Sequence, residues 1–254
     1  MDDEALFAES DHNLITASVA MFNPRGAPPE RVRHFGPVTA LLTGVERYNP
    51  IFAFDPRAGA RDLRAAIDWS RSNGAQPSIE IRASLDPVLG TVARELGLSA
   101  DPWRTPAMAL DPIPDEIPAG PADLEIHELA GSDAIATWHL VWGTSPAMQA
   151  AYTESIEAID RARILIGFID GRAVSSAIAY GTADSVGLYG IATLPDAQRR
   201  GYGRAVTWAA IETARRAWAV STAVLQSTDQ GVPLYRSMGF RVVGEYVEFA
   251  TPEA

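Results

Sequence analysis

The sequence predicts a two-domain α/β protein whose C-terminal half forms a mixed β-sheet flanked by helices. Three observations predict this class. Apolar runs alternate with amphipathic stretches in both halves, a glycine loop joins a run to a helix in the second half, and a proline-rich segment divides the chain. With 254 residues, 47% of them hydrophobic, the chain can bury one large core or two moderate ones.

The N-terminal half contains two alternations of strand and helix. An apolar run over 51–55 leads to an amphipathic helix over 62–74, which Gly74 ends. A strand over 77–82 and a helix over 86–98 follow. This order predicts a small α/β unit.

A proline-rich segment separates the two halves. The segment 111–123 contains Pro112, Pro114, Pro118 and Pro121. Proline disfavours both a helix interior and a central strand, so we interpret this segment as a linker. We therefore predict an N-terminal domain over 1–118 and a C-terminal domain over 119–254.

The C-terminal half contains more elements in a longer order. We predict a strand over 122–129, helices over 133–143 and 148–160, and a hairpin of strands over 163–170 and 173–181. Strands over 186–193 and 220–228 flank a helix over 204–218, which makes them parallel neighbours. Ligands of such crossover units bind beyond the carboxyl ends of the strands. A short helix over 231–238 ends at Gly239.

The most informative motif is the loop 198–203, which reads QRRGYG and lies between a strand and a helix. Free backbone N–H groups and the helix dipole make such a helix start an anion site, and Gly201 and Gly203 let a pyrophosphate approach the main chain. The loop is no P-loop, because no Lys follows the second glycine, and all 21 basic residues are Arg. It also lacks the third glycine of a dinucleotide fingerprint. The alternative interpretation is a glycine turn that caps a buried helix.

The order strand, Q-x-x-G-x-G, helix, strand, then Y-x-x-x-G-F over 235–240, resembles the GNAT superfamily of acyl-CoA-dependent N-acyltransferases. The resemblance covers about residues 122–250. It implies the GNAT acyl-CoA N-acyltransferase fold, acetyl-CoA as the acyl donor, and no metal. It also implies that the strands over 186–193 and 220–228 splay apart, with the pantetheine arm in the gap.

The resemblance also implies which residues of this sequence bind the acyl donor. The loop backbone would hold the pyrophosphate, Arg199, Arg200 and Arg204 would add charge, and the main chain over 191–193 would hold pantetheine and polarise the thioester carbonyl. The predicted donor-binding residues are Ile191, Ala192, Thr193, Gln198, Arg199, Arg200, Gly201, Tyr202, Gly203, Arg204 and Thr228. Thr193 stands where many relatives have Val. The alternative for Arg199 and Arg204 is a solvated side chain.

Tyr235 matches the tyrosine that acts as the acid in the family, where it protonates the departing CoA thiolate. A phenol with a pKa near 10 is of the right order for this transfer. The alternative is a ring that only packs against the core.

The general base is harder to assign. Many relatives carry a Glu on the strand before the glycine loop, whereas this strand offers only Tyr189. We predict Glu154 as the base, with Glu157, Glu245 and Glu248 as alternatives, although such residues usually form a solvated face. His139, between Trp138 and Leu140, is more typical of a core histidine. An acceptor amine of low pKa needs no dedicated base.

The N-terminal half repeats the order of the C-terminal one. From helix start to closing glycine, 62–97 matches 204–239 in length, which favours a divergent internal repeat. The segment between Asp55 and Asp62 lacks the glycine pattern, and Ala93 stands in the place of Tyr235. We therefore expect a degenerate GNAT-like N-terminal domain and one acetyl-CoA per chain; the alternative is an unrelated α/β domain.

The amino-acid composition limits the classes of molecule that the protein is expected to bind. A net charge of −11 argues against nucleic acid and slightly favours a cationic amine. The absence of Cys excludes a disulfide scaffold, a thiolate metal site and a cysteine nucleophile. The N-terminus is acidic and no apolar run reaches membrane length, which predicts a cytoplasmic protein without a membrane partner. The sequence does not decide whether the protein forms a homodimer.

The function predicted from the sequence is transfer of an acetyl group from acetyl-CoA to a primary amine of a small molecule by direct attack on the thioester. Two alternatives remain. One is a non-catalytic acyl-CoA-binding module, and the other is acetylation of a peptide or protein amine. The identity of the amine, the acyl chain preference and the base are not fixed by the sequence.

Overall fold

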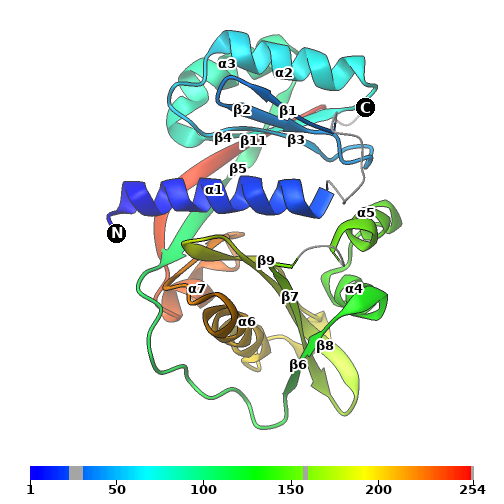
Figure 1. The fold of residues 1–254 in the computed structure, drawn as a ribbon, viewed down its shortest axis with the longest axis vertical. Helices are drawn as coiled ribbons and strands as arrows, with labels where there is room; N and C mark the ends of the chain where they lie inside the picture. Colours follow the sequence, from blue (N-terminus) through cyan, green and yellow to red (C-terminus); the bar gives the residue numbers. More distant parts are fainter. Residues whose placement is uncertain (23–30, 157–159, 253–254) are drawn as a thin grey trace.

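The computed structural model describes residues 1–22, 31–156 and 160–252 (Figure 1). Within these residues, eleven strands form a single mixed sheet that runs through both halves of the chain. Helices cover both of its faces. The mixed α/β class predicted from the sequence is confirmed.

The N-terminal half begins with a long helix. Its elements are α1 (Asp3–Phe22), β1 (Val32–Phe35), β2 (Val38–Leu41), β3 (Asn49–Ala53), α2 (Ala60–Ser72), β4 (Pro77–Arg82), a 3₁₀ turn (Ala83–Leu85), a π turn (Asp86–Gly90), α3 (Thr91–Glu95) and β5 (Ser99–Leu110). The segment 111–124 contains no helix or strand. It is tied to the C-terminal half through bonds such as the one from the Ile113 N–H to the Ser221 carbonyl, at 2.8 Å.

The C-terminal half follows the predicted order. Its elements are β6 (Glu125–Leu129), α4 (Gly131–Trp142), α5 (Pro146–Ile156), β7 (Ala162–Ile169), β8 (Arg172–Gly181), β9 (Ser185–Thr193), a 3₁₀ turn (Pro195–Ala197), α6 (Tyr202–Trp218), β10 (Thr222–Gln226), α7 (Val232–Ser237) and β11 (Arg241–Ala250). The predicted hairpin is the antiparallel pair β7 and β8, and β9 lies parallel to β10.

The last strand of each half pairs with the other half. The sheet order is β1-β2-β3-β4-β11-β5-β10-β9-β8-β7-β6. β5 therefore lies beside β10 of the C-terminal half, and β11 lies beside β4 of the N-terminal half. Both strands run from one half to the other in Figure 1. This exchange joins the halves by backbone hydrogen bonds, so the sheet does not divide at the linker.

The pairing scheme occurs twice. In the first half, β1, β2 and β3 are antiparallel neighbours and β3 is parallel to β4 across α2. In the second half, β7, β8 and β9 are antiparallel neighbours and β9 is parallel to β10 across α6. This repetition is what an internal duplication would produce, and it agrees with the similar lengths of the two halves in the sequence.

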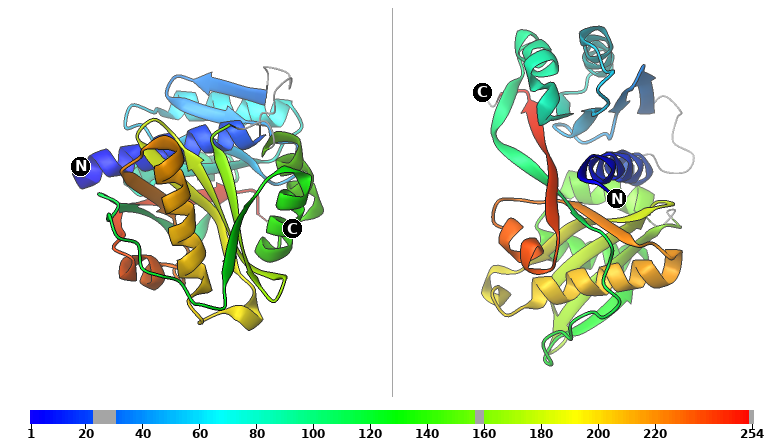
Figure 2. Two further views of the ribbon diagram at one scale, coloured as in Figure 1. Left: turned by 60° about the horizontal axis from the view of Figure 1, so that its bottom comes forward. Right: turned by 90° about the vertical axis from the view of Figure 1, so that its left-hand side faces the viewer.

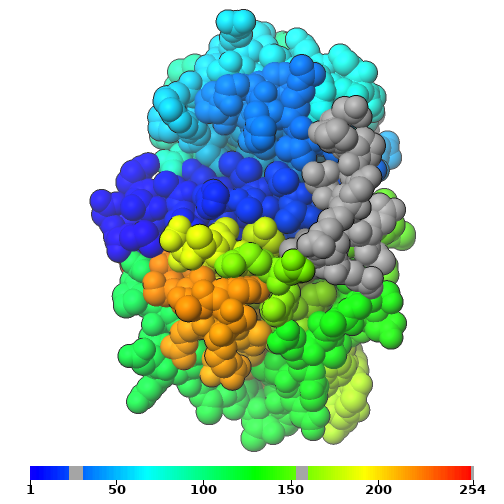
Figure 3. Space-filling view, in the orientation of Figure 1, coloured from blue at the N-terminus to red at the C-terminus, as the bar shows by residue number. Residues whose placement is uncertain are grey.

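Helix α1 lies between the two halves (Figures 2 and 3). Leu6, Phe7, Ala17, Met21 and Phe22 of this helix are buried, and most join one apolar cluster with residues from β2, β3, β8, β11, α4 and α5. A second cluster holds α6 and α7 on the other face of the sheet, and a third holds α2 and α3. α1 therefore serves as a shared core element of both halves.

Some predictions for the first half are wrong or incomplete. The helix expected over 86–98 is a π turn followed by the short α3, and α1, β1, β2 and β5 are not predicted at all. No helix in the described ranges is long and apolar enough to span a bilayer.

Candidate active site

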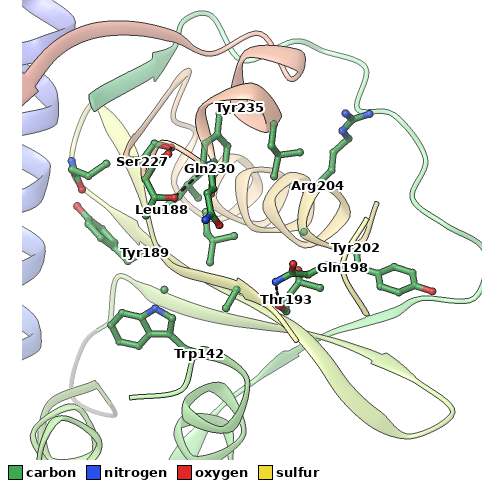
Figure 4. Close-up of a pocket in the computed structure, with 18 of the residues that line it drawn as sticks. Trp142, Leu188, Tyr189, Thr193, Gln198, Tyr202, Arg204, Ser227, Gln230 and Tyr235 are labelled. Carbon is green, nitrogen blue, oxygen red and sulfur yellow. Dashed lines mark hydrogen bonds between the residues drawn. The ribbon is translucent and has the colours of Figure 1, made fainter. Parts of the chain in front are cut away.

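A pocket of about 710 Å³ opens between β9 and β10, and it is closed at one end by the start of α6 and along one side by α7 (Figure 4). Arg204, Tyr202, Gln198 and Thr193 lie at one end of it, and Tyr189 and Trp142 lie at the other. Its size is in the range of small-molecule sites.

The pocket exists because two parallel strands separate. β9 and β10 pair only from Ser185 with Thr222 to Gly187 with Val224. Beyond that point the pocket is lined by residues 188–193 on one side and 226–228 on the other. The backbone groups of both segments are thereby available to a ligand, as the resemblance implied.

A β-bulge in β9 lies in the wall of this pocket. The register with β8 shifts between Ser176 and Ile178, and Gly190 has a φ of 53°. Its carbonyl accepts hydrogen bonds from Trp138 Nε1 at 3.0 Å and from Ser176 Oγ at 3.2 Å. A Cβ at this position would lie 2.3 Å from the Trp138 ring, so only glycine fits. The bulge interrupts the ladder to β8 beside Ile191.

The glycine loop has a positive φ at Gly201, which its sequence allowed, and at Arg199, which its sequence did not suggest. Arg199 and Gly201 have φ values of 61° and 85°, and Gly201 is the N-cap of α6. The first helical bond runs from the Ala205 N–H to the Gly201 carbonyl, so the N–H groups of residues 202–204 have no partner within the helix. With the helix dipole, these groups make the start of α6 a candidate anion site at the pocket wall.

Side chains hold the loop against β9. Gln198 Nε2 donates to the Thr193 carbonyl at 3.1 Å, and a Cβ on Gly203 would lie 3.1 Å from Thr193 Oγ1. The ring of Tyr202 is buried, and its hydroxyl donates to Asp123 Oδ2 at 2.6 Å. Tyr202 therefore lines the pocket with its backbone and not with its ring. The loop and the strand therefore pack closely, and a side chain at position 203 would need a small shift of the Thr193 hydroxyl.

The predicted donor-binding residues gather here, with one exception. Arg200 is exposed and does not line the pocket, whereas the other residues predicted from Ile191 to Arg204, together with Thr228, all do. Arg204 donates to Ser237 Oγ at 2.8 Å, which ties α6 to α7. Their roles in binding stay predictions, but their common location follows from the strand, loop and helix order.

Tyr235 lies on α7 at the side of the pocket and is buried. Its ring contacts Phe240 edge-on, with 5.8 Å between ring centroids. Burial raises the pKa of its phenol to about 12. Gly231 makes room for it, since a Cβ there would lie 3.0 Å from the Tyr235 ring. The phenol is thus held protonated at neutral pH.

No carboxylate or histidine lines the pocket in the part of the chain that the structure describes. Glu154 lies on α5, but its side chain, like all of Glu157, falls outside the described residues. Glu245 lies 3.5 Å from Arg104, and Glu248 bonds Thr105, both on the stretch of β11 beside β5 and away from the pocket.

His139 is a core residue, as expected. It is buried beside Trp138 and Tyr152 and bonds Thr144 Oγ1 through Nδ1. Burial lowers the pKa of its imidazole to about 4, so the ring is neutral at physiological pH. It does not reach the pocket.

Several lining residues were not predicted from the sequence, namely Trp142, Leu188, Gln226, Ser227, Gln230 and Leu234. Gln226 and Ser227 could have been found, because they lie at the carboxyl end of a strand flanking a crossover helix. Trp142 gives no such signal. It reaches the pocket only because α4 packs across β9. No group of three or more His, Cys, Asp or Glu suited to a metal occurs in the described ranges.

Comparison with known proteins agrees with this geometry. Residues 132–240 match the model of the acetyltransferase (GNAT) family. The chain is similar in structure to a GCN5-related N-acetyltransferase from Kribbella flavida, with a TM-score of 0.73, 19% identity and 96% of each chain covered. No curated protein matches the sequence.

Two further solved structures share the fold. A GCN5-related N-acetyltransferase from Sphaerobacter thermophilus gives a TM-score of 0.63 at 17% identity, covering 86% of this chain and 78% of that one. A tandem GNAT protein from the clavulanic acid biosynthesis pathway gives 0.60 at 14% identity, covering 100% of this chain and 97% of that one.

The family match assigns this chain to the acyltransferases, and the separated strands and the glycine loop lie within the matched residues. The C-terminal half of this chain, over residues 132–240, belongs to the GNAT acetyltransferase family.

Proposed function

We propose that this protein transfers an acetyl group from acetyl-CoA to a primary amine of a small molecule. The observation that carries the proposal is the continuity of the pocket. It runs from the candidate anion site at the start of α6, along the edge of β9 that no longer pairs with β10, past Tyr235, to the aromatic end at Trp142 and Tyr189. A ligand with a pyrophosphate, a peptide-like arm and a thioester matches these features in this order.

The donor end suits an acyl-CoA. Backbone N–H groups at the start of α6 face the anion site, and Arg199 and Arg204 supply positive charge beside it. The absence of a Cβ at Gly203 leaves the main chain open to close approach. The edge of β9 from Ile191 to Thr193 offers amide groups to the pantetheine arm and to the thioester carbonyl.

Tyr235 is suited to stabilise the departing thiolate. Its pKa of about 12 keeps the phenol protonated over the working range of pH. A thiol with a pKa near 8.5 is a stronger acid than this phenol, so full transfer is uphill by roughly three pKa units. Tyr235 therefore acts mainly through a strong hydrogen bond to the developing thiolate, and solvent completes the proton transfer.

The acceptor end favours an amine that arrives uncharged. None of the described lining residues is a carboxylate or histidine that could remove a proton from an ammonium ion. The attacking nitrogen must have a free lone pair, so the proposal favours amines of low pKa or activity that rises with pH. The net charge of −11 assists the approach of cationic amines to the surface.

We further propose that the N-terminal half is a degenerate GNAT-like domain. Its strand pairing repeats that of the C-terminal half, and Ala93 is a buried core residue where the second half has Tyr235. It would support the catalytic half through α1 and the exchanged β5 and bind no donor of its own.

The test is release of CoA thiol from acetyl-CoA with a panel of primary amines, alongside titration calorimetry of acetyl-CoA. We expect micromolar to millimolar binding and thiol release that depends on amine. Binding without amine-dependent release would favour the alternative, a non-catalytic acyl-CoA module. Release with peptide amines alone would favour acetylation of proteins.

A further inference from the structure

Helix α1 carries a hydrogen-bond chain that begins at the pocket. Tyr189, at the acceptor end, places its hydroxyl 2.7 Å from Asn13 Oδ1 of α1, and Figure 4 shows the side chain directed toward that helix. Asn13 Nδ2 lies 3.0 Å from Ser185 Oγ, and Ser185 Oγ lies 2.6 Å from a Glu9 carboxylate oxygen. Asn13 is fully buried, so these contacts fix it.

The direction of every bond in this chain follows from the carboxylate at its end. A carboxylate accepts only, so Ser185 donates to Glu9 and its oxygen accepts from Asn13 Nδ2. The Tyr180 carbonyl, 3.4 Å from the same nitrogen, requires the same orientation of the amide. Asn13 Oδ1 is therefore the acceptor toward the pocket, and Tyr189 must donate its single proton to it.

A second chain starts one helical turn earlier on α1. Gln226 Nε2, also in the pocket wall, lies 3.1 Å from Ser10 Oγ. Ser10 Oγ lies 3.2 Å from the Tyr246 hydroxyl, which lies 2.8 Å from Asp11 Oδ1. The Tyr246 proton goes to the carboxylate because the charged acceptor is the stronger one, and Ser10 then donates to the Tyr246 oxygen. Ser10 thus accepts from Gln226.

Both chains leave the same kind of group for a ligand. Tyr189 gives its one proton to Asn13, so it can only accept from a ligand, through the lone pairs of Oη. Gln226 gives one N–H to Ser10, which orients its amide and leaves Oε1 as an acceptor beside the second N–H. Ser10 and Asn13 are three residues apart on α1 and hence on one face, and their partners Gln226 and Tyr189 both line the pocket. We propose that these two oxygens bind the two N–H groups of the acceptor amine, with Asn13 and Ser10 as positioning residues.

This inference rests on the proposed function and adds the acceptor class to it. A primary amine that donates both N–H bonds keeps its lone pair for the thioester carbonyl, whereas a secondary amine satisfies only one oxygen and an alcohol has one proton to give. Asn13 carries no proton away, because an amide does not ionise at neutral pH. Gly187 completes the arrangement, since a Cβ there would lie 1.9 Å from Asn13 Oδ1.

The experiment compares aniline with N-methylaniline as acceptors, because both are neutral at pH 7 and differ in one N–H. The readout is the ratio of kcat/KM for the two amines, with acetyl-CoA affinity measured by calorimetry. The variants are Tyr189→Phe, which removes one acceptor oxygen, and Asn13→Leu, which removes its partner. The control is Tyr48→Phe, which removes a phenol that contacts Ser18 farther along α1, away from the pocket.

We expect wild type and Tyr48→Phe to prefer aniline equally, and Tyr189→Phe to lower that preference by about fivefold, the usual size of one neutral hydrogen bond. Acetyl-CoA affinity should not change. If Tyr189→Phe leaves the ratio of kcat/KM for the two amines unchanged, the inference is wrong and the proposed function still stands. This holds whether or not Asn13→Leu folds. Absence of thiol release by wild type with these and other primary amines overturns the proposed function, and the inference with it.

Discussion

Replacement of Tyr235 by Phe isolates one hydroxyl group in this site. The ring and its edge contact with Phe240 are retained, and the hydroxyl makes no hydrogen bond to another described side chain or backbone group. The free energy of unfolding should therefore change by no more than about 0.5 kcal/mol. The donor contacts on β9 and α6 are untouched, so the dissociation constant of acetyl-CoA should stay within about twofold of wild type.

Turnover should respond differently. Loss of the hydrogen bond to the departing thiolate should slow the acyl-transfer step by roughly 10²-fold or more, which is about 2.7 kcal/mol of barrier. Because the Tyr235 pKa is about 12, its ionisation should produce no loss of activity below about pH 11 in wild type. Below that pH, the dependence of the rate on pH should come from ionisation of the acceptor amine or of groups other than Tyr235.

The assay is single-turnover thiol release with excess enzyme and a saturating amine, which observes chemistry before product release. Steady-state rates alone are insufficient, since a slow release step would hide the effect. A Phe variant that matches wild type in the single-turnover rate would show that water protonates the thiolate and that Tyr235 only packs.

Other predictions follow from the same geometry. Gly203→Glu should abolish acetyl-CoA binding in a folded protein, and calorimetry should give one acetyl-CoA per wild-type chain; retained affinity or a stoichiometry of two would contradict the site or the degenerate half. Gly190→Ala should cost roughly 2 kcal/mol or more in urea unfolding because of the Trp138 ring, whereas Gly143→Ala, with open space around it, should cost about 1 kcal/mol. Burial depresses the His139 pKa from 6.5 to about 4, so its stabilisation is present above pH 6.5 and lost as pH falls to 4. His139→Gln should flatten the pH dependence of the free energy of unfolding between pH 6.5 and 4, and identical profiles would refute this prediction.

The C-terminal half was predictable because its signals are local. The β7–β8 hairpin, the parallel β9–β10 pair and the start of α6 each follow from periodicity and from glycine positions within a few residues. The same local order brought the predicted donor residues to one pocket. Arg200 is the exception, because the sequence gives no way to tell which side of the loop a residue faces.

The missed elements depend on contacts between the halves. α1 is buried around much of its circumference by both halves, so its apolar residues show no single stripe. β5 contains Pro102 and Pro106, which argue against a strand between two others. It nevertheless pairs with both β11 and β10, a position that only the exchange of strands creates. The sequence also gives no sign that α1 contacts Tyr189 and Gln226 at the acceptor end, because these contacts join residues far apart in the chain.

We propose that the pocket between β9 and β10 brings a bound acyl-CoA to an amine. The most direct measurement is mass spectrometry of the products formed from acetyl-CoA labelled in its acetyl group and a primary amine. We expect labelled amide and CoA in equal amounts, both lost in Gly203→Glu. Labelled acetate with no amide, or amide formation that Gly203→Glu leaves intact, would contradict it.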